Sequence, residues 1–441
     1  MMDGMKQTGI RWIGEVPQEW TILKMKHFSY MKGRIGWQGL TADEFIDEGP
    51  YLITGTDFDK GKVCWDRCYH ISEKRYNEAV PIQVRVGDLL VTKDGTIGKL
   101  AYIDSLPGKA SLNSHLLVIR PVGGKFVNRF LYWVLDSSVF QGYYEFESYG
   151  STMDSLSQEK IGDFSFFAPS VKEQKKIADY LDVECARLDF IIKTIEQQID
   201  IMRIYKKTLI TETVTKGLNK KADMKESGVD WIGSIPTHWD TKRLKYVLVV
   251  PLQYGANEAG DDYNDDYPRY IRITDITDDN ELKEDGKLSL LPKLAKPYLL
   301  SHGDVLFARS GATVGKTFYY KEEHGVAAFA GYLIRARANA KYILSKFLYY
   351  TTLGNGYDNW KNTVFTQATI QNIGADKYSQ LTVTLPPIKE QQEIIAFLDT
   401  ECKKIDEILI EKEIQLATIK RHKTSLIYEY VTGKKRVKEV I

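Results

Sequence analysis

Residues 311–317 have nearly the composition of a phosphate-binding loop. The segment contains two glycines and ends in Lys316 and Thr317. In nucleotide-binding loops, residues of these types cradle phosphates and hold Mg²⁺. The glycines here are four positions apart, whereas the loop needs five. We therefore expect no nucleotide binding at this segment.

Oxygen ligands for a divalent cation gather just after residue 260. Asp262, Asn264 and Asp266 alternate as they do in a calcium-binding loop. Such a loop also needs a glycine and, later, a glutamate. These two positions hold Tyr267 and Ile273, so we interpret the segment as a solvated acidic loop.

Two further groups of possible metal ligands are incomplete. Cys64, Cys68 and His70 would supply three ligands, but no fourth lies at zinc spacing. Asp278 and Asp279 are carboxylates of the kind that hold a nuclease metal, yet the pair occurs in one place only and is crowded. The sequence therefore predicts no metal site.

Basic residues beside glycine-containing turns are the remaining candidates for chemistry. Lys93 and Lys99 flank one such turn, and Arg309 and Lys316 flank another. Glycine lets a backbone approach a phosphate closely, and an arginine can hydrogen-bond both acceptors of a guanine edge. The pattern favours two DNA-contacting loops, with plain β-turns carrying solvated charges as the alternative.

A second pair of segments has matching flanks but different chemistry. Residues 113–115 read Asn-Ser-His, and residues 330–332 read Ala-Gly-Tyr. Asparagine and histidine can read base edges or cap a turn. Different side chains at equivalent places are expected if each reads different bases. The predicted DNA-contacting residues are Lys93, Thr96, Lys99, Asn113, His115, Ser151, Thr152, Arg309, Ser310, Thr313, Lys316, Tyr332, Thr363 and Gln367.

These paired segments belong to a duplication of the whole chain. The pattern Trp-Ile-Gly-x-Val/Ile-Pro-x-x-Trp begins at Trp12 and again at Trp231. Gly-Asp-x-Leu begins at residues 87 and 303, and Pro-x-Val/Ile-Lys-Glu-Gln at residues 169 and 386. The last offset is 217 residues, far longer than a solenoid unit. The chain is therefore predicted to contain two copies of one domain.

Each copy is predicted to begin with a globular part of mixed α and β structure. In residues 30–168 and 246–385, short β-rich runs such as residues 116–119 are interrupted by turns and by helical stretches. Tryptophans 12, 20, 231 and 239 could stack on bases. We interpret them instead as packing residues where the globular part meets a helix.

A long helix is predicted to follow each globular part. In residues 172–215, steps of four and three separate Leu181, Cys185, Leu188, Ile192, Ile195, Ile199 and Met202, with Leu209 one heptad further. The rhythm returns from Leu398 to Leu426. Such seams are typical of paired helices, each about 66 Å long. Packing of each helix on its own globular part is the alternative. The basic positions Arg203, Lys206, Lys207 and 420–423 are interpreted as a solvated face, with contact to phosphate or a partner as the alternative.

Composition limits how DNA could be bound and where the protein works. The 60 Lys and Arg against 59 Asp and Glu give a net charge of +1, so any DNA footprint must be local. The chain has four cysteines, no signal-peptide pattern and no run of 18 apolar residues. These features predict a reduced, cytoplasmic protein without a membrane segment.

Taken in order and in duplicate, the motifs resemble the specificity subunit of Type I restriction-modification enzymes. The resemblance rests on the tryptophan motifs at 12 and 231, Gly-Asp-x-Leu at 87 and 303, and the helix starts at 169 and 386. It implies an α+β fold in which two pseudo-symmetric target-recognition domains are separated by a long antiparallel two-helix coiled coil. The implied domains are 1–170 and 221–387 for target recognition, with 171–220 and 388–441 as spacer helices.

The resemblance also implies partners. The chain would recognise a bipartite asymmetric site on double-stranded DNA and dock two methyltransferase subunits, through which restriction subunits join in host defence. S-adenosylmethionine would bind the adenine-methylating partner, and this chain would be neither an enzyme nor a cofactor carrier. No Asn/Asp-Pro-Pro-aromatic tetrapeptide of amino-methyltransferases is present. The alternatives are a self-contained DNA methyltransferase or nuclease with an unrecognised active site, and a coiled-coil scaffold without a DNA role.

Overall fold

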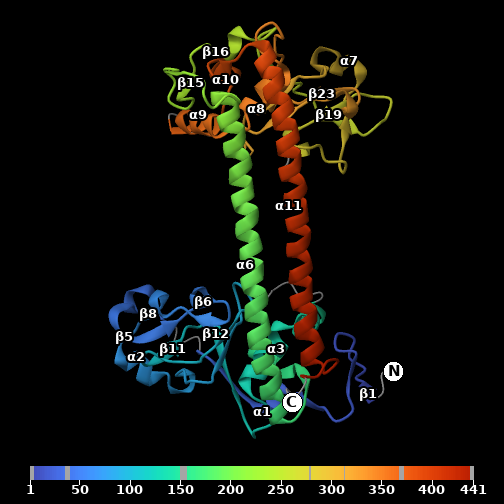
Figure 1. Ribbon diagram of the computed structural model, residues 1–441. Coiled ribbons are helices and arrows are strands. Elements are labelled where there is room, and N and C mark those ends of the chain that lie inside the picture. Colours follow the sequence, from blue (N-terminus) through green and yellow to red (C-terminus); the bar gives the residue numbers. More distant parts are fainter. Residues whose placement is uncertain are drawn as a thin grey trace. The chain divides into compact units, whose positions relative to one another are not determined.

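The chain forms two compact units, each containing one globular domain and parts of two long helices (Figure 1). The computed structural model describes residues 4–34, 40–148, 156–277, 280–311, 313–366 and 372–437. The first unit is Met1–Glu196 with Ile414–Ile441, and the second is Gln197–Glu413. The long helices are α6 (Val171–Lys216) and α11 (Ile388–Val431). The unit boundary therefore falls within these helices.

Thirteen strands and five short α-helices make up the described globular part of the first unit. The strands are β1 (Met5–Gln7), β2 (Glu15–Pro17), β3 (Thr21–Lys24), β4 (Ser29–Gly33), β5 (Ile46–Ile53), β6 (Phe58–Asp59), β7 (Lys62–Val63), β8 (Tyr69–His70), β9 (Leu89–Thr92), β10 (Leu100–Tyr102), β11 (Ala110–Leu112), β12 (Leu116–Pro121) and β13 (Ser165–Ala168). The helices are α1 (Met25–Phe28), α2 (Glu73–Glu78), α3 (Asn128–Asp136), α4 (Ser138–Ser148) and α5 (Gln158–Asp163).

The central sheet of the first unit is four-stranded and antiparallel, with strand order β10-β9-β12-β4. All four residues of β9 and residues 116–119 of β12 are buried, because apolar clusters cover both faces of these strands. A second sheet has the order β11-β5-β8, with β11 parallel to β5. The predicted strand at residues 116–119 is therefore an interior strand of the central sheet.

The globular part of the second unit has the same plan. Its strands are β14 (Met224–Glu226), β15 (Ser234–Pro236), β16 (Asp240–Arg243), β17 (Gln253–Tyr254), β18 (Asp261–Asp262), β19 (Arg269–Ile271), β20 (Leu288–Ser289), β21 (Val305–Ala308), β22 (Thr317–Tyr319), β23 (Ala327–Phe329), β24 (Leu333–Ala336) and β25 (Thr382–Leu385). Its helices are α7 (Pro292–Ala295), α8 (Ser345–Thr351), α9 (Asn355–Thr366) and α10 (Ala375–Ser379). The central sheet runs β22-β21-β24-β17, which is the order of the first unit with each strand replaced by its repeat.

Within each unit, α6 and α11 pack antiparallel. In the first unit the ring of Tyr180 near the start of α6 lies 4.6 Å from that of Tyr430 near the end of α11. In the second unit Lys206, late in α6, meets Asp406, early in α11. The seam residues predicted from the heptads are buried or half-buried. The α+β fold with two repeated domains and long antiparallel helices is thus confirmed.

Charged pairs bridge the two helices at equivalent positions in the two units. In the first unit Lys423 Nζ lies 2.6 Å from Asp189. In the second, Lys206 Nζ lies 2.6 Å from Asp406, and both members are the 217-residue counterparts of the first pair. The interpretation of these lysines as a solvated face is wrong, because the heptad places them beside the partner helix. Polar pairs at a seam stabilise little but fix its register.

A buried glutamine ties the start of each long helix to the globular domain. Gln391 in α11 donates to the carbonyl oxygens of Tyr342 and Pro386, at 2.9 and 2.8 Å, and accepts from Leu344 N at 2.8 Å. Gln174 in α6 makes the same three kinds of bond. Both side chains are fully buried. The Lys-Glu-Gln motif is therefore a structural joint.

The end of each long helix rests on a tryptophan. Gly433 follows α11 with φ of +70°, and a Cβ there would come within 2.9 Å of the Trp20 ring. Gly217 follows α6 with φ of +72°, and a Cβ there would come within 3.0 Å of Trp239. Trp20 and Trp239 are fully buried. These tryptophans pack where globular part and helix meet, as interpreted from the sequence.

Replacing Gln391 by leucine should destabilise the protein. The change leaves three buried main-chain groups without a partner, each costing about 1–3 kcal/mol. We expect the free energy of unfolding to fall by about 3 kcal/mol or more, measured by urea unfolding followed by circular dichroism. Gln380→Leu, at an exposed position, is the control and should have an effect below about 0.5 kcal/mol. Equal effects of the two changes would contradict the assigned joint.

Candidate nucleic-acid interface

The two turns predicted from glycines and basic residues lie at equivalent places. One joins β9 to β10 and the other joins β21 to β22, so each closes a hairpin in the central sheet. Gly98 and Gly315 have φ of +77° and +81°, a conformation that favours glycine. In the first turn the hydroxyl of Thr92 donates to the Thr96 carbonyl at 2.5 Å and accepts from Lys99 N at 2.9 Å. The turn is thereby held in one shape.

The first turn meets residues 113–115 and forms what we name the first loop cluster: Arg34, Lys93, Asp94, Asn113 and His115. Lys93 N donates to the His115 carbonyl at 3.0 Å. The His115 ring Nδ1 lies 2.5 Å from Asp94 Oδ1. Asn113 Oδ1 accepts from His115 N at 3.0 Å, so Asn113 caps a turn, as the sequence alternative allowed. The His115 side chain is exposed, and its contact with Asp94 holds the ring next to the basic turn.

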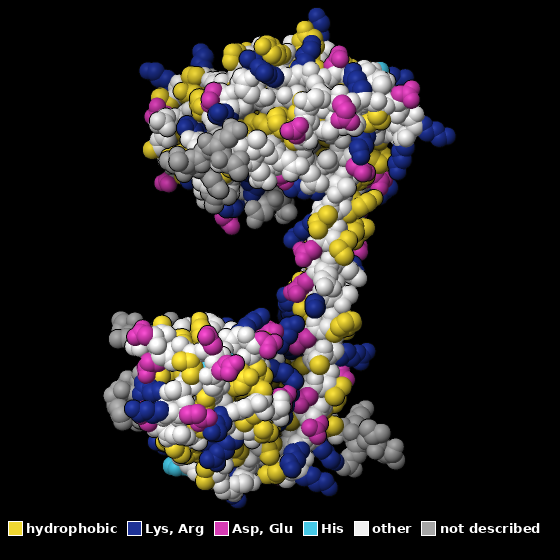
Figure 2. All heavy atoms as spheres, turned by 90° about the vertical axis from the view of Figure 1, so that its left-hand side faces the viewer, with side chains coloured by type: hydrophobic (Ala, Val, Ile, Leu, Met, Phe, Trp, Pro, Cys, Tyr) yellow, Lys and Arg dark blue, Asp and Glu magenta, His cyan; other side chains and the backbone are white. Residues whose placement is uncertain are grey.

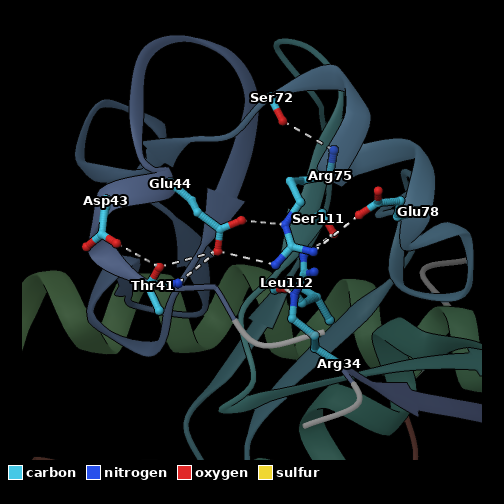
Figure 3. A network of polar contacts seen from close by, with 9 residues as sticks. All are labelled: Arg34, Thr41, Asp43, Glu44, Ser72, Arg75, Glu78, Ser111 and Leu112. Carbon is cyan, nitrogen blue, oxygen red and sulfur yellow. Dashed lines mark hydrogen bonds and ion pairs between the residues drawn. The ribbon is translucent and has the colours of Figure 1, made fainter. Parts of the chain in front are cut away.

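The buried Arg34 is hydrogen-bonded to Ser111 and Leu112, which lead into residues 113–115 (Figure 3). Arg34 Nε donates to the Leu112 carbonyl at 2.8 Å, one residue before Asn113. Its guanidinium also bonds Ser111 Oγ at 3.2 Å. Arg75 lies close by and pairs with Glu44 at 2.7 Å. Burial, together with the neighbouring Arg75, lowers the pKa of Arg34 to about 10, so Arg34 stays charged at neutral pH.

The second turn forms the second loop cluster, which consists of Tyr254, Arg309 and Tyr332. Arg309 N donates to the Tyr332 carbonyl at 3.0 Å, the counterpart of the bond between Lys93 and His115. The Arg309 guanidinium carbon lies 4.9 Å from the centre of the Tyr254 ring. Arg309 Nε is buried and has no hydrogen-bond partner among the described residues. Tyr332 is 62% exposed, so the cluster presents a stacked arginine and an open aromatic ring.

The other predicted residues are not part of the two clusters as defined. Thr96 and Lys99 are exposed on the first turn, whereas Lys316 Nζ donates to the Ile276 carbonyl at 3.4 Å. Ser310 and Thr313 are half-buried in the second turn. Thr363 lies on α9, where its hydroxyl donates to the Asn359 carbonyl. Ser151, Thr152 and Gln367 lie outside the described residues.

Arg34 and Tyr254 escaped prediction from the sequence. No local motif marks either residue, and the two differ in chemistry. They lie at neighbouring places in the fold: Arg34 directly follows Gly33, the β4 residue that pairs with Leu117, and Tyr254 is the β17 residue that pairs with Ile334. Leu117 and Ile334 are counterparts at the 217-residue offset. The sheet register thus makes Gly33 the counterpart of Tyr254, and both Arg34 and Tyr254 reach their loops only through the folded sheet.

The surface charge is mixed. On the face shown in Figure 2, Lys and Arg side chains are interspersed with Asp and Glu, as the net charge of +1 leads one to expect. Among the described residues no group of three or more His, Cys, Asp or Glu side chains is arranged to hold a metal ion. No described helix is long and apolar enough to cross a membrane. Any anionic partner must therefore be bound by local features such as the loop clusters.

Comparison with known proteins identifies the family of this chain. Residues 36–200 and 236–417 match the family model of the Type I restriction modification DNA specificity domain. The chain belongs to this specificity family. Specificity subunits supply DNA sequence recognition to Type I restriction-modification and are its non-catalytic subunits. The alternative of a self-contained methyltransferase or nuclease is thereby set aside.

Named relatives of this specificity subunit extend over nearly its whole length. It is 25% identical to the Type I restriction enzyme StySPI specificity subunit of Salmonella potsdam, over 90% of this chain and 86% of that protein. It is 23% identical to the Type I restriction enzyme MjaVIII specificity subunit of Methanocaldococcus jannaschii, over 96% and 95%. A solved chain from work on complex assembly and conformational transition of the type I R-M system matches with a TM-score of 0.70 and 15% identity, over 95% and 99%. At that identity, the likeness concerns the fold alone.

Replacing Arg34 by methionine should loosen residues 113–115 of the specificity subunit. The Leu112 carbonyl would lose a donor worth about 1.5–3 kcal/mol, so amide exchange at Asn113 and His115 should speed up about tenfold or more. Hydrogen-exchange mass spectrometry measures this directly. Arg85→Met, at an exposed arginine of the same unit, is the matched control. Unchanged exchange at residues 113–115 would show that Arg34 does not hold the loop.

Proposed function

We propose that this specificity subunit reads a bipartite, asymmetric DNA site, with one globular domain on each half. The observation that carries the proposal is the pair of loop clusters at equivalent points of two equivalent sheets. The backbone bond from Lys93 to His115 has its counterpart from Arg309 to Tyr332, while the side chains differ in chemistry. The same framework with different side chains suits recognition of two different base sequences.

The side chains of the two clusters suit different kinds of contact with DNA. In the second, the Arg309 guanidinium lies over the Tyr254 ring, and an arginine held against an aromatic ring suits a bidentate contact to guanine. In the first, Lys93 suits a phosphate, while Asn113 and His115 offer donors and acceptors to base edges. Thr96, Lys99, Ser310, Thr313 and Lys316, on the two turns, and the other predicted residues Ser151, Thr152, Thr363 and Gln367 would contact the DNA backbone.

The domain assignment follows the same logic. Residues 1–170 and 221–387 are proposed as target-recognition domains, and residues 171–220 and 388–441 as spacer helices. The observed bounds of α6 and α11 support this division. The spacer helices would set the distance between the two half-sites.

The long helices also carry surfaces suited to protein partners. In the first unit Phe190 is 72% exposed and Val183 66% exposed on α6. In the second, Ile204 on α6 and Ile410 on α11 are 65% and 57% exposed. Contiguous exposed apolar surface marks interaction sites, and Val183 and Phe190 are one heptad apart, so they lie on the same side of α6. We assign these faces to two methyltransferase subunits, which would bind S-adenosylmethionine, methylate adenine and recruit restriction subunits in the cytoplasm.

Replacing Arg309 by alanine should change one half of the methylated sequence only. A bidentate contact to guanine is worth about 1–3 kcal/mol of discrimination, so preference at one position should fall by roughly fivefold to a hundredfold. The variant would be co-expressed with the methyltransferase, and methylated adenines mapped across the host genome.

Lys93→Ala is the matched control for this experiment, because Lys93 occupies the equivalent place in the other unit. It should leave the half-site altered by Arg309→Ala unchanged. Changes in both halves from either single substitution would refute modular reading.

Shortening both helices by one heptad should shorten the gap between half-sites. Removing residues 197–203 and 413–419 together keeps Asp189 opposite Lys423 and Lys206 opposite Asp406. The reason is that both deletions lie between the two ion pairs and shorten the two helices equally. Seven residues span about 10 Å of helix, or roughly three base pairs. Methylome mapping would measure the gap.

Removing residues 197–203 alone is the control for the paired deletion. It shifts α6 against α11, so the two sets of ion pairs cannot form together, and the assembled complex should be lost. A paired deletion that folds and leaves the gap unchanged would show that the helices do not set the spacing.

A further inference from the structure

A groove of about 970 Å³ lies within the first unit, between the globular domain and α6. The turn between β6 and β7, the turn between β9 and β10, helix α3 and residues of α6 line it. Three exposed lysines from distant parts of the chain face it: Lys60, Lys99 and Lys193. None of the three forms an ion pair among the described residues, whereas most acids around them do.

The carboxylates of the groove are largely neutralised by their own partners. Asp182 pairs with Arg129 at 2.6 Å, and Asp189 with Lys423 at 2.6 Å. Glu196 pairs with Lys420 at 2.8 Å. Asp136 is the lining carboxylate without an ion pair among the described residues. Three uncompensated cations therefore face one uncompensated anion, and the groove is locally cationic on a chain of net charge +1.

Lys60 has a left-handed backbone conformation that is unfavourable for lysine. It occupies the first position of the two-residue turn between β6 and β7, with φ of +47°, and Gly61 follows with φ of +77°. Such turns favour asparagine, aspartate or glycine at the first position. A Cβ at residue 61 would collide with the hydroxyl of Tyr132, 2.3 Å away, so the turn is seated firmly on α3. A strained lysine held over a groove points to a role for its charge.

Among its described residues, the second unit has no equivalent of this set of charges. Asn280, beside the bridge between Ile276 and Leu282, has φ of +61°. Asparagine is well suited to that conformation. The counterpart of Lys99 is Lys316, which bonds the Ile276 carbonyl, and the residue 217 positions after Lys193 is Ile410. The cationic groove is thus a property of the first unit.

We propose that this groove holds a stretch of DNA sugar-phosphate backbone, with Lys60, Lys99 and Lys193 as its phosphate contacts. The inference rests on the proposed DNA-reading function and adds a sequence-independent clamp to one side of it. Lysine contacts to phosphate release counterions and supply affinity, and they carry no choice of base. The first unit would then contribute more salt-dependent binding than the second. Lys99 would link the clamp to the first loop cluster, because Lys99 lies on the same turn between β9 and β10 as Lys93 and Asp94 of that cluster.

The test is the salt dependence of DNA binding by the complex of the full chain with its methyltransferase. Fluorescence anisotropy would follow a duplex carrying the mapped recognition site from 50 to 400 mM salt, a range of about one decade. Each lost phosphate contact should make the logarithmic slope shallower by about 0.9. The triple variant Lys60→Gln, Lys99→Gln, Lys193→Gln should therefore lose nearly three in slope, with its methylated sequence unchanged.

Two single substitutions keep the test independent of folding. Lys60→Asn suits the left-handed position better, so it should weaken binding and flatten the slope by about 0.9 at an equal or higher melting temperature. Asp136→Asn removes the opposing carboxylate and should tighten binding. Lys125→Gln, at an exposed lysine of the same unit outside the groove, is the control and should leave the slope unchanged.

The outcomes separate this inference from the function on which it rests. A wild-type complex that binds no duplex would refute the DNA-reading function and the clamp with it. Normal wild-type binding with an unchanged slope in the triple variant would refute the clamp alone. Loss of methyltransferase binding in the triple variant, with DNA affinity intact, would show that the groove takes an acidic protein segment instead.

Discussion

The antiparallel contact between α6 and α11 is the constraint on which the rest of the molecule depends. Each globular domain is fastened to the start of one long helix and to the end of the other. In the first unit Gln174 joins the domain to α6, while Trp20 receives the end of α11. In the second, Gln391 and Trp239 exchange these roles. Neither domain could keep both attachments if the helices slid against each other. The alignment of the two helices, which the Lys–Asp pairs fix, is therefore required for the attachments in both units.

This dependence explains why charge appears in a seam otherwise made of apolar residues. Leucine and isoleucine bury area in any register that keeps the heptad, whereas Lys206 opposite Asp406 is satisfied in one. Partly exposed ion pairs add little to stability, roughly 0–1 kcal/mol each. Their contribution is to penalise the wrong alignments, in which a lysine would face a leucine.

The sequence was most informative where the physics is periodic or local. Heptad spacing and the duplicated motifs predicted two repeated domains and two long helices, because such patterns report directly on a helix face. The glycine turns at Gly98 and Gly315 were equally legible. Sequence separation hid the rest: Arg34 supports the loop at residue 113 through a carbonyl some eighty positions away, and Tyr254 meets Arg309 only once the sheet has formed. Solvent-exposed lysines on a helix could not be told from partnered ones until both helices were seen together.

The seam pairs also bear on the origin of the chain. Asp189 and Lys206 both lie on α6, and their counterparts Asp406 and Lys423 both lie on α11, each acid facing the other helix's base. Each helix thus offers the same two charges to the other, as the two subunits do in an isologous dimer. Two molecules of a half-length ancestor would have offered each other the same complementary charges. Fusion of two such genes would have preserved the dimer interface inside one polypeptide, leaving each half free to diverge.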